Sequence, residues 1–117
     1  PSVRVNGIAP ATVVAGSTLY QRPRVTALLT QHKIPYADDE TTEALREKLA
    51  RVFAGRTLLQ QPITPDLCAE AILWLAGDHS GRTTGHIIPV DGGLPEAFLR
   101  WREPGQLSMI ALTTPSW

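Results

Sequence analysis

Cysteine is almost absent from this sequence of 117 residues, and neither charge predominates. The single cysteine, Cys68, excludes an internal disulfide, which is typical of a reducing compartment, so we expect a cytoplasmic protein. The 11 basic and 11 acidic side chains leave a formal net charge of zero. Without a basic excess or a run of like charge, the composition gives no reason to expect nucleic acid as a partner.

Long apolar runs are also missing. No segment approaches the roughly 18 to 20 apolar residues that a membrane-spanning helix needs, and the first residues lack the charged and apolar regions of a secretory signal. We therefore expect no membrane partner. The length allows one domain with a modest core. Because the chain opens with Pro1 and runs almost at once into a predicted strand, we expect it to be a fragment of something longer.

The common signatures of a self-contained catalytic or nucleotide site are absent as well. The sequence has neither a Gly-x-x-x-x-Gly-Lys phosphate loop nor a Gly-x-Gly-x-x-Gly dinucleotide turn. His32, His79 and His86 are scattered, so we predict no metal site. No nucleophile, base and orienting group can be assembled, and no catalytic residue is assigned. Asp91 has two interpretations: a metal or acid/base group or, more often, a residue that fixes a turn through its own backbone.

Two short apolar runs near glycines predict β-strands. The first covers 3–8, where apolar and polar residues alternate until Pro10, whose missing amide hydrogen should end the strand. The second covers 86–90 and is mostly β-branched and uncharged. Pro89 cannot donate to a ladder, which predicts that the second strand lies at a sheet edge. Two strands separated by helices predict an α/β fold with a parallel sheet.

Three helices are predicted between these strands, at 22–33, 40–54 and 65–76. Asp38 or Asp39 can cap the second helix by accepting a bond from an unpaired backbone amide. The third begins with a hydroxyl cap and a proline and is apolar on nearly all sides. Such a helix is expected to be buried, here by the sheet on one side and by another subunit on the other.

The loop 11–18 separates the first strand from the first helix, and its side chains are small and uncharged. One interpretation is an apolar loop that packs on its own domain. The other is a ligand-binding loop at the carboxyl end of a parallel strand, which is where α/β sheets bind their ligands. The residues alone leave both open.

Two groups of residues together resemble the short-chain dehydrogenase/reductase family. The stretch 4–10, Arg-Val-Asn-Gly-Ile-Ala-Pro, is similar to that family's sixth strand. The second group is similar to its last helix, turn and seventh strand and comprises Pro65–Ala76, Asp78, Ser80, Thr83-Thr84-Gly85 and Val90-Asp91-Gly92-Gly93. The resemblance implies that 1–100 is the C-terminal segment of a Rossmann-like doubly wound parallel sheet, an incomplete domain, followed by an irregular tail at 101–117. The family's first five strands, glycine-rich turn and Ser and Tyr-x-x-x-Lys catalytic set would lie outside this sequence.

The resemblance also implies an activity and a cofactor. The complete domain would be an NAD(P)-dependent oxidoreductase that transfers hydride between an alcohol and a carbonyl, with NAD or NADP as cofactor. The positions that correspond to the cofactor loop are Pro10, Ala11, Thr12, Val13 and Ala15, with the Val13 backbone at the nicotinamide carboxamide. The family usually has glycine at position 11 and threonine at position 15. Ala15 lacks the hydroxyl that would lie near the pyrophosphate, and Ser17 and Thr18 are the candidates to replace it.

A narrower likeness concerns one branch of the family. Residues 13–17, a long helical insert, 56–59 and the residues after Gly93 look like the dehydrogenase end of bifunctional rhamnulose-1-phosphate aldolase/alcohol dehydrogenases. That likeness implies the C-terminal module of a longer sugar-catabolic enzyme that acts on a small hydroxyaldehyde. The wider family resemblance implies a small hydroxy or carbonyl substrate covered by the helices at 22–54. The apolar helix 65–76 and the edge strand 86–90 predict a homo-oligomer. Two alternatives stay open: a catalytically inactive module that acts only as an oligomerisation surface, and a small α/β domain unrelated to dehydrogenases.

Overall fold

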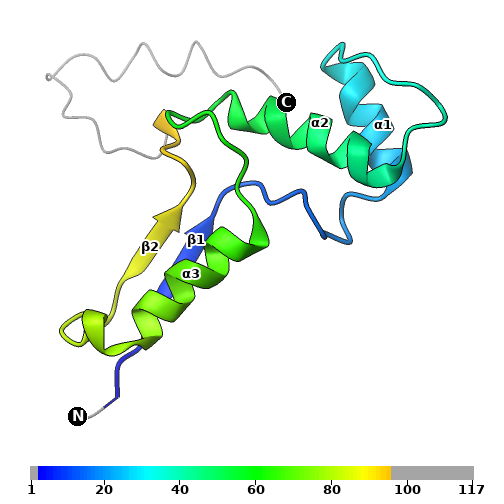
Figure 1. Ribbon diagram of the computed structural model, residues 1–117. Coiled ribbons are helices and arrows are strands. Elements are labelled where there is room, and N and C mark those ends of the chain that lie inside the picture. Colours follow the sequence, from blue (N-terminus) through cyan, green and yellow to red (C-terminus); the bar gives the residue numbers. More distant parts are fainter. Residues whose placement is uncertain (1–2, 96–117) are drawn as a thin grey trace, which may run out of the picture.

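The computed structural model describes residues 3–95 of the chain, so the predicted tail 101–117 lies outside the described residues. Figure 1 shows two strands packed on one helix in one part of the molecule and a pair of helices in the other. No helix in the described part of the chain is long and apolar enough to cross a lipid bilayer. The elements are, in order, β1 (Gly7–Pro10), α1 (Arg22–Gln31), α2 (Thr42–Ala54), α3 (Pro65–Ala76), a 3-10 helix η1 (Asp78–Ser80) and β2 (Ile87–Val90).

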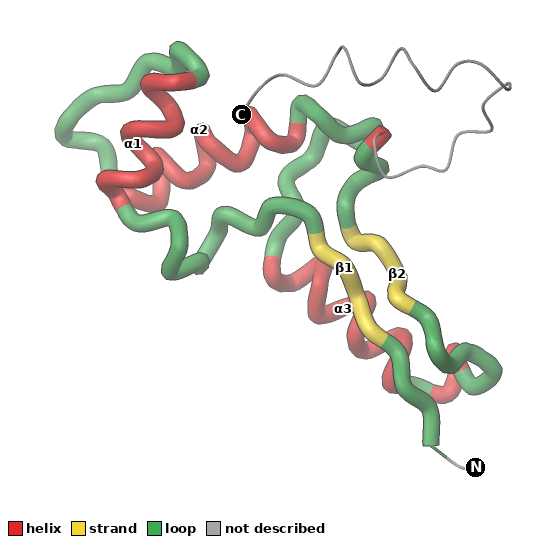
Figure 2. The backbone as a smooth tube through the Cα atoms, turned by 180° about the vertical axis from the view of Figure 1, so that it is seen from behind, coloured by secondary structure: helices red, strands yellow, loops and turns green. Residues whose placement is uncertain are grey.

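The strands β1 and β2 pair in parallel, as predicted, and lie side by side over α3 (Figure 2). The amides of Gly7 and Ala11 donate to carbonyl oxygens of the β2 segment at 2.9 and 3.1 Å. In a parallel ladder only alternate residues face a given neighbour. The nitrogens of Pro10 and Pro89 therefore both point away from the partner strand. Neither proline removes a hydrogen bond between β1 and β2, and Pro89 has the orientation expected in an edge strand.

The prediction of a first strand at 3–8 was wrong in its bounds, because β1 starts at Gly7 and continues through Pro10. The preceding residues bond to the turn before β2 rather than to β2 itself. The Val5 amide donates to the Thr84 hydroxyl at 3.0 Å, and the Gly85 amide donates to the Val5 carbonyl at 2.7 Å. The alternation of apolar and polar side chains in this stretch therefore reflects an extended segment without a strand neighbour.

Arg4 holds the sheet, α3 and η1 together. Its guanidinium donates to the carbonyl oxygens of Leu75, Gly77 and Ser80 at 2.9, 3.0 and 2.9 Å. The first two carbonyls lie at the end of α3, where the last turn leaves acceptors unpaired and the helix dipole favours a cation. Asn6 fixes the turn before β2 through its side-chain amide and carbonyl, at 2.8 and 3.2 Å. The Arg-Val-Asn stretch is thus a structural clamp.

The helix α1 ends at Gln31, two residues earlier than predicted. The chain turns there because Lys33 adopts a left-handed φ of 57°. The Ile34 amide then donates to the Leu29 carbonyl at 2.9 Å, which closes a Schellman motif. Glycine is the usual residue at this position, so a lysine gave no signal in the sequence for the end of the helix.

The helix α2 begins at Thr42, and its cap is Thr41 rather than Asp38 or Asp39 as predicted. The Thr41 hydroxyl accepts the Ala44 amide at 3.2 Å. Thr41 is the last capping residue before the helix, and a cap must stand directly before the first helical residue to reach the free amides of the first turn. For α3 the predicted bounds are confirmed, with a threonine hydroxyl as its cap.

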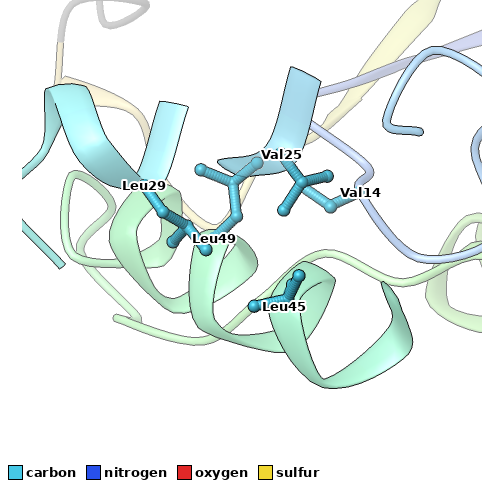
Figure 3. Close-up of a cluster of buried hydrophobic side chains, with 5 residues drawn as sticks. All are labelled: Val14, Val25, Leu29, Leu45 and Leu49. Atoms are coloured by element: carbon cyan, nitrogen blue, oxygen red, sulfur yellow. The ribbon is translucent and has the colours of Figure 1, made fainter. Parts of the chain in front are cut away.

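The fully buried core lies in the helical hairpin, away from the two strands. Figure 3 shows its five side chains gathered between α1, α2 and the loop that precedes α1. Beside the sheet, Leu75 of α3 is buried. Next to it in sequence, Ile72, Leu73 and Trp74 of α3 are 53%, 70% and 47% exposed. The expectation that α3 is buried therefore holds for the side that packs on the strands. The five core residues are Val14, Val25, Leu29, Leu45 and Leu49.

Candidate functional site

The candidate site lies where the chain leaves the carboxyl end of β1. Ala11, the first residue after the strand, is held to β2 by the bond from its amide to the Val90 carbonyl, at 3.1 Å. Two residues further on, Val13 forms an isolated parallel bridge with Ile63, just before α3. The loop is thereby fixed to the next strand on one side and to the α2–α3 connection on the other. This is the edge at which parallel α/β sheets bind ligands.

The turn after β2 closes the same edge. The carbonyls of Gly93 and Gly92 accept the amides of Leu58 and Leu59, each at 3.0 Å. Both glycines have a left-handed φ, of 64° and 80° in chain order. A Cβ at Gly92 would lie 3.0 Å from the Thr57 hydroxyl, so the backbone approaches closer than a side chain permits. We call this contact between 57–59 and 92–93 the glycine clasp.

Asp91 fixes this turn. Its carboxylate accepts the Gly93 amide at 2.8 Å, so the turn interpretation is confirmed. Within residues 3–95, no three His, Cys, Asp or Glu side chains are placed to hold a metal ion. The three histidines lie apart: His32 caps the end of α1, His79 lies in η1 and His86 precedes β2.

A small cavity lies between the loop after β1 and the end of α2. Its volume is about 180 Å³. Ala11 and Thr12 form one wall, and the opposite wall belongs to α2, with Phe53 as its largest side chain. No residue of α1 lines it, although the whole range 22–54 was predicted to cover the substrate. The remaining lining residues are Ala50, Ala54, Arg56, Thr57, Gln61, Ile63 and Leu94.

The five predicted cofactor residues do not all share this cavity. Ala11 and Thr12 line it, while Pro10 ends β1 and Val13 pairs with the α2–α3 connection. Ala15 is exposed and lines a separate groove of about 500 Å³, beside charged residues of α2. The two spaces share Ala50 and Ile63 in their linings, and Val14, between Ala11–Thr12 and Ala15 in sequence, turns its fully buried side chain into the core. The loop therefore presents two faces to solvent.

Two residues whose contacts were not predicted from the sequence shape this region. Arg46 of α2 binds two carbonyls of the loop that leads to α1. Thr57 is 7% exposed and donates to the Ala54 carbonyl at 2.9 Å, which fixes the clasp to the end of α2. Both contacts join residues that lie close only in the folded chain or at an irregular turn, so neither contact has a signal in the periodicity of the sequence.

The electrostatics of the hairpin centre on Glu40. The Lys48 ammonium, 2.7 Å from its carboxylate, lowers the pKa of Glu40 below its ordinary value of 4.5. The hydrogen bond from the Ala37 amide acts in the same direction, and burial opposes both. This ion pair braces the α1–α2 connection, away from the loop after β1.

The loop's chemistry fits the nicotinamide end of a dinucleotide. Positions 10–18 carry backbone amides and hydroxyls but no charged side chain. Such groups suit an uncharged carboxamide and a flat ring. They supply no cation for a diphosphate, and the Ala15 methyl cannot donate a hydrogen bond.

Comparison with known proteins gives the family. Residues 36–95 match the family model described as enoyl-(acyl carrier protein) reductase. A short chain dehydrogenase family protein from Francisella tularensis has a similar structure, with a TM-score of 0.56 and 25% identity over 81% of this chain and 34% of that one. A C-terminal deletion mutant of Thermoplasma acidophilum aldohexose dehydrogenase has a TM-score of 0.54 and 25% identity, over 80% of this chain and 35% of that one. The chain belongs to the short-chain dehydrogenase/reductase family, and its α/β fold matches part of a Rossmann-like domain, as predicted.

A curated relative extends the comparison. The uncharacterized oxidoreductase YuxG of Bacillus subtilis (strain 168) is 32% identical over 98 residues, which are 84% of this chain and 13% of that protein. The chain therefore spans about a third of the similar dehydrogenase structures and a smaller part of YuxG.

Proposed function

We propose that this chain provides the nicotinamide-facing part of an NAD(P)-dependent short-chain oxidoreductase that interconverts an alcohol and a carbonyl. The observation that carries the proposal is the position of Pro10–Val13. These residues leave the carboxyl end of β1, are held to β2 and to Ile63, and form one wall of a cavity. Bound NAD or NADP would supply the hydride chemistry, and the residues of this chain would orient the ring.

Each loop residue has a separate task in this proposal. Pro10 restricts the backbone where the strand ends, which limits the freedom of the loop. The Val13 backbone offers its amide groups to the carboxamide, and the bridge to Ile63 keeps that backbone in place. Ala11 and Thr12 shape the wall against which the ring would rest. Backbone amides and the Ser17 and Thr18 hydroxyls are the donors that this loop offers a diphosphate, and any cation would come from outside positions 10–18.

The substrate is proposed to be a small hydroxy or carbonyl compound covered by α2. Phe53 and its neighbours form an apolar wall that would exclude water from the reacting centre. The chain would be the dehydrogenase end of a bifunctional rhamnulose-1-phosphate aldolase/alcohol dehydrogenase, with a small hydroxyaldehyde as substrate. The length of YuxG supports this, because a 98-residue match that is 13% of a protein leaves ample room for another domain.

A second candidate function is assembly alone. Ile72, Leu73 and Trp74 are exposed at consecutive positions of α3, and Ile87 of β2 is exposed as well. Exposed apolar groups of this size commonly mark an interface. In the main proposal this surface joins subunits of the oxidoreductase. In the alternative it is all that the chain contributes, and the loop after β1 binds nothing.

Titration of the ¹⁵N-labelled chain with NADH distinguishes the two functions. We expect NADH to shift the amide signals of Thr12, Val13 and Ala15, while AMP, which lacks the nicotinamide, leaves them in place. Equal responses to NADH and AMP would overturn the main proposal. We also expect no NADH turnover at 340 nm by the purified chain, because its described residues contain no assembled catalytic set. Turnover would mean that catalytic residues lie within these 117 residues.

A further inference from the structure

Arg46 of α2 is bound to the loop that follows the proposed cofactor residues. Its Nε donates to the Tyr20 carbonyl at 2.7 Å, and one Nη donates to the Ser17 carbonyl at 3.1 Å. The other Nη lies 3.4 Å from the Glu43 carboxylate, one turn earlier on the same helix. Its side chain is 18% exposed, so these bonds form in a largely shielded place. Charge-assisted bonds of this kind are stronger than neutral ones.

The loop is folded around these two carbonyls. The Ser17 amide donates to the Val14 carbonyl at 3.3 Å, and the Tyr20 amide donates to the Ser17 carbonyl at 3.2 Å. Gly16, between them, has a φ of 67° and nothing within 4 Å of where its Cβ would be. Ala15 and Gly16 are therefore held from both ends. On one side the Val14 side chain is buried in the core, and on the other Arg46 binds the Ser17 carbonyl.

This arrangement joins two parts of the proposed site. Ala15 and Gly16 line the groove beside α2, and Arg46 lines it too. The same helix forms a wall of the cavity at Ala11 and Thr12. A displacement of α2 would therefore move both faces of the loop. It would act on Ala11 and Thr12 through side-chain packing, and on Ala15 and Gly16 through the Arg46 guanidinium.

We propose that Arg46 is a positioning residue. It couples α2, the proposed substrate cover, to residues 13–16, which include the proposed cofactor residues Val13 and Ala15. This inference rests on the proposed function. It requires a guanidinium, because two carbonyls in different directions must be bound at once. A lysine ammonium keeps the charge but is a single point donor on a flexible stem. Arg46→Lys should therefore restore little of the effect of Arg46→Met.

Hydrogen exchange of the full chain, followed by NMR, provides the first measurement. We expect Arg46→Met to speed exchange of the Ser17 and Tyr20 amides roughly tenfold or more, as for the loss of about 1.4 kcal/mol. Lys48→Met is the matched control, since Lys48 lies on the same helix and binds the 35–40 connection instead. Lys48→Met should leave exchange at the Ser17 and Tyr20 amides unchanged while speeding exchange in the 35–40 connection.

Nicotinamide binding provides the second measurement. We expect Arg46→Met and Arg46→Lys to weaken the NADH-dependent shifts at Val13 and Ala15 severalfold, and Lys48→Met to leave them as in the wild type. If both Arg46 variants keep wild-type exchange and wild-type shifts, the inference is overturned. If the wild type gives no NADH-specific shift, the proposed function fails, and with it the coupling to a cofactor. The exchange data then still decide whether Arg46 orders the loop.

Discussion

At the residue scale, the glycine clasp shows how little of the site is readable from residue types. A Gly-Gly pair after a strand predicts a turn, and the turn is confirmed. Its partner was not predictable, because Thr57 and Leu58 lie in a stretch without periodicity, far from Gly92 in sequence. Asp91 was predictable in kind, since an aspartate before glycines commonly bonds its own backbone.

Gly92→Ala should destabilise the chain more than an alanine at a glycine with open surroundings. Two features of Gly92 oppose a Cβ there: its left-handed φ of 64°, and the Thr57 hydroxyl 3.0 Å from where the Cβ would lie. We expect a loss of about 2 to 4 kcal/mol, the sum of a left-handed backbone cost and an overpacking cost. Gly85→Ala is the control: φ is 76° but nothing lies within 4 Å, so about 1 to 2 kcal/mol is expected. Urea unfolding measures both, and equal losses would contradict the close contact.

At the element scale, the helices were more predictable than the strands. Their periodicity is long enough to identify them, and α3 was bounded correctly by its capping threonine and proline. Errors occurred where a single local cap or turn, or a tertiary contact, decided the boundary. Thr41 capped α2 in place of the aspartates, a left-handed Lys33 ended α1 early, and bonds to the 83–86 turn kept residues 3–6 out of the sheet.

The α1–α2 hairpin should owe part of its stability to the ionised Glu40. A carboxylate whose pKa is lowered in the folded state stabilises the fold above its ordinary pKa of 4.5, and this contribution is lost as the pH falls through the lowered value. Glu40→Gln should therefore lower the Tm at neutral pH, and the difference from the wild type should shrink and vanish in acid. Thermal unfolding followed from about pH 7 to about pH 3 measures it.

Glu47→Gln is the matched control for this pH series, because Glu47 is an exposed acid on α2, the helix that follows Glu40 in the chain. Its Tm should follow that of the wild type at every pH. A Tm difference for Glu40→Gln that stays constant across the series would show that the side chain acts through packing rather than through its charge.

At the scale of the whole molecule, the family could be predicted, and the position of the core could not. The ordered set of motifs around β1, α3 and β2 identified the family, and the comparisons confirm it. These motifs surround a sheet of two strands, whereas the five fully buried side chains lie in the hairpin and its loop. Amphipathic spacing identifies an inner helix face but not its partner, so the pairing of Val14 with α1 and α2 required the structure.

The exposed face of α3 leads to a prediction about assembly. Leu73 is 70% exposed between Ile72 and Trp74, and a monomer gains nothing from leaving such side chains in water. If this face joins subunits, sedimentation of the wild-type chain should reveal a concentration-dependent oligomer, and Leu73→Glu should shift it to monomer without lowering the Tm of the monomer. Arg24→Glu, at an exposed position of α1, is the control and should leave assembly intact. A wild-type chain that stays monomeric at high concentration would remove both the subunit interface and the assembly-only function. The loop after β1 would then be the remaining candidate for what this chain contributes.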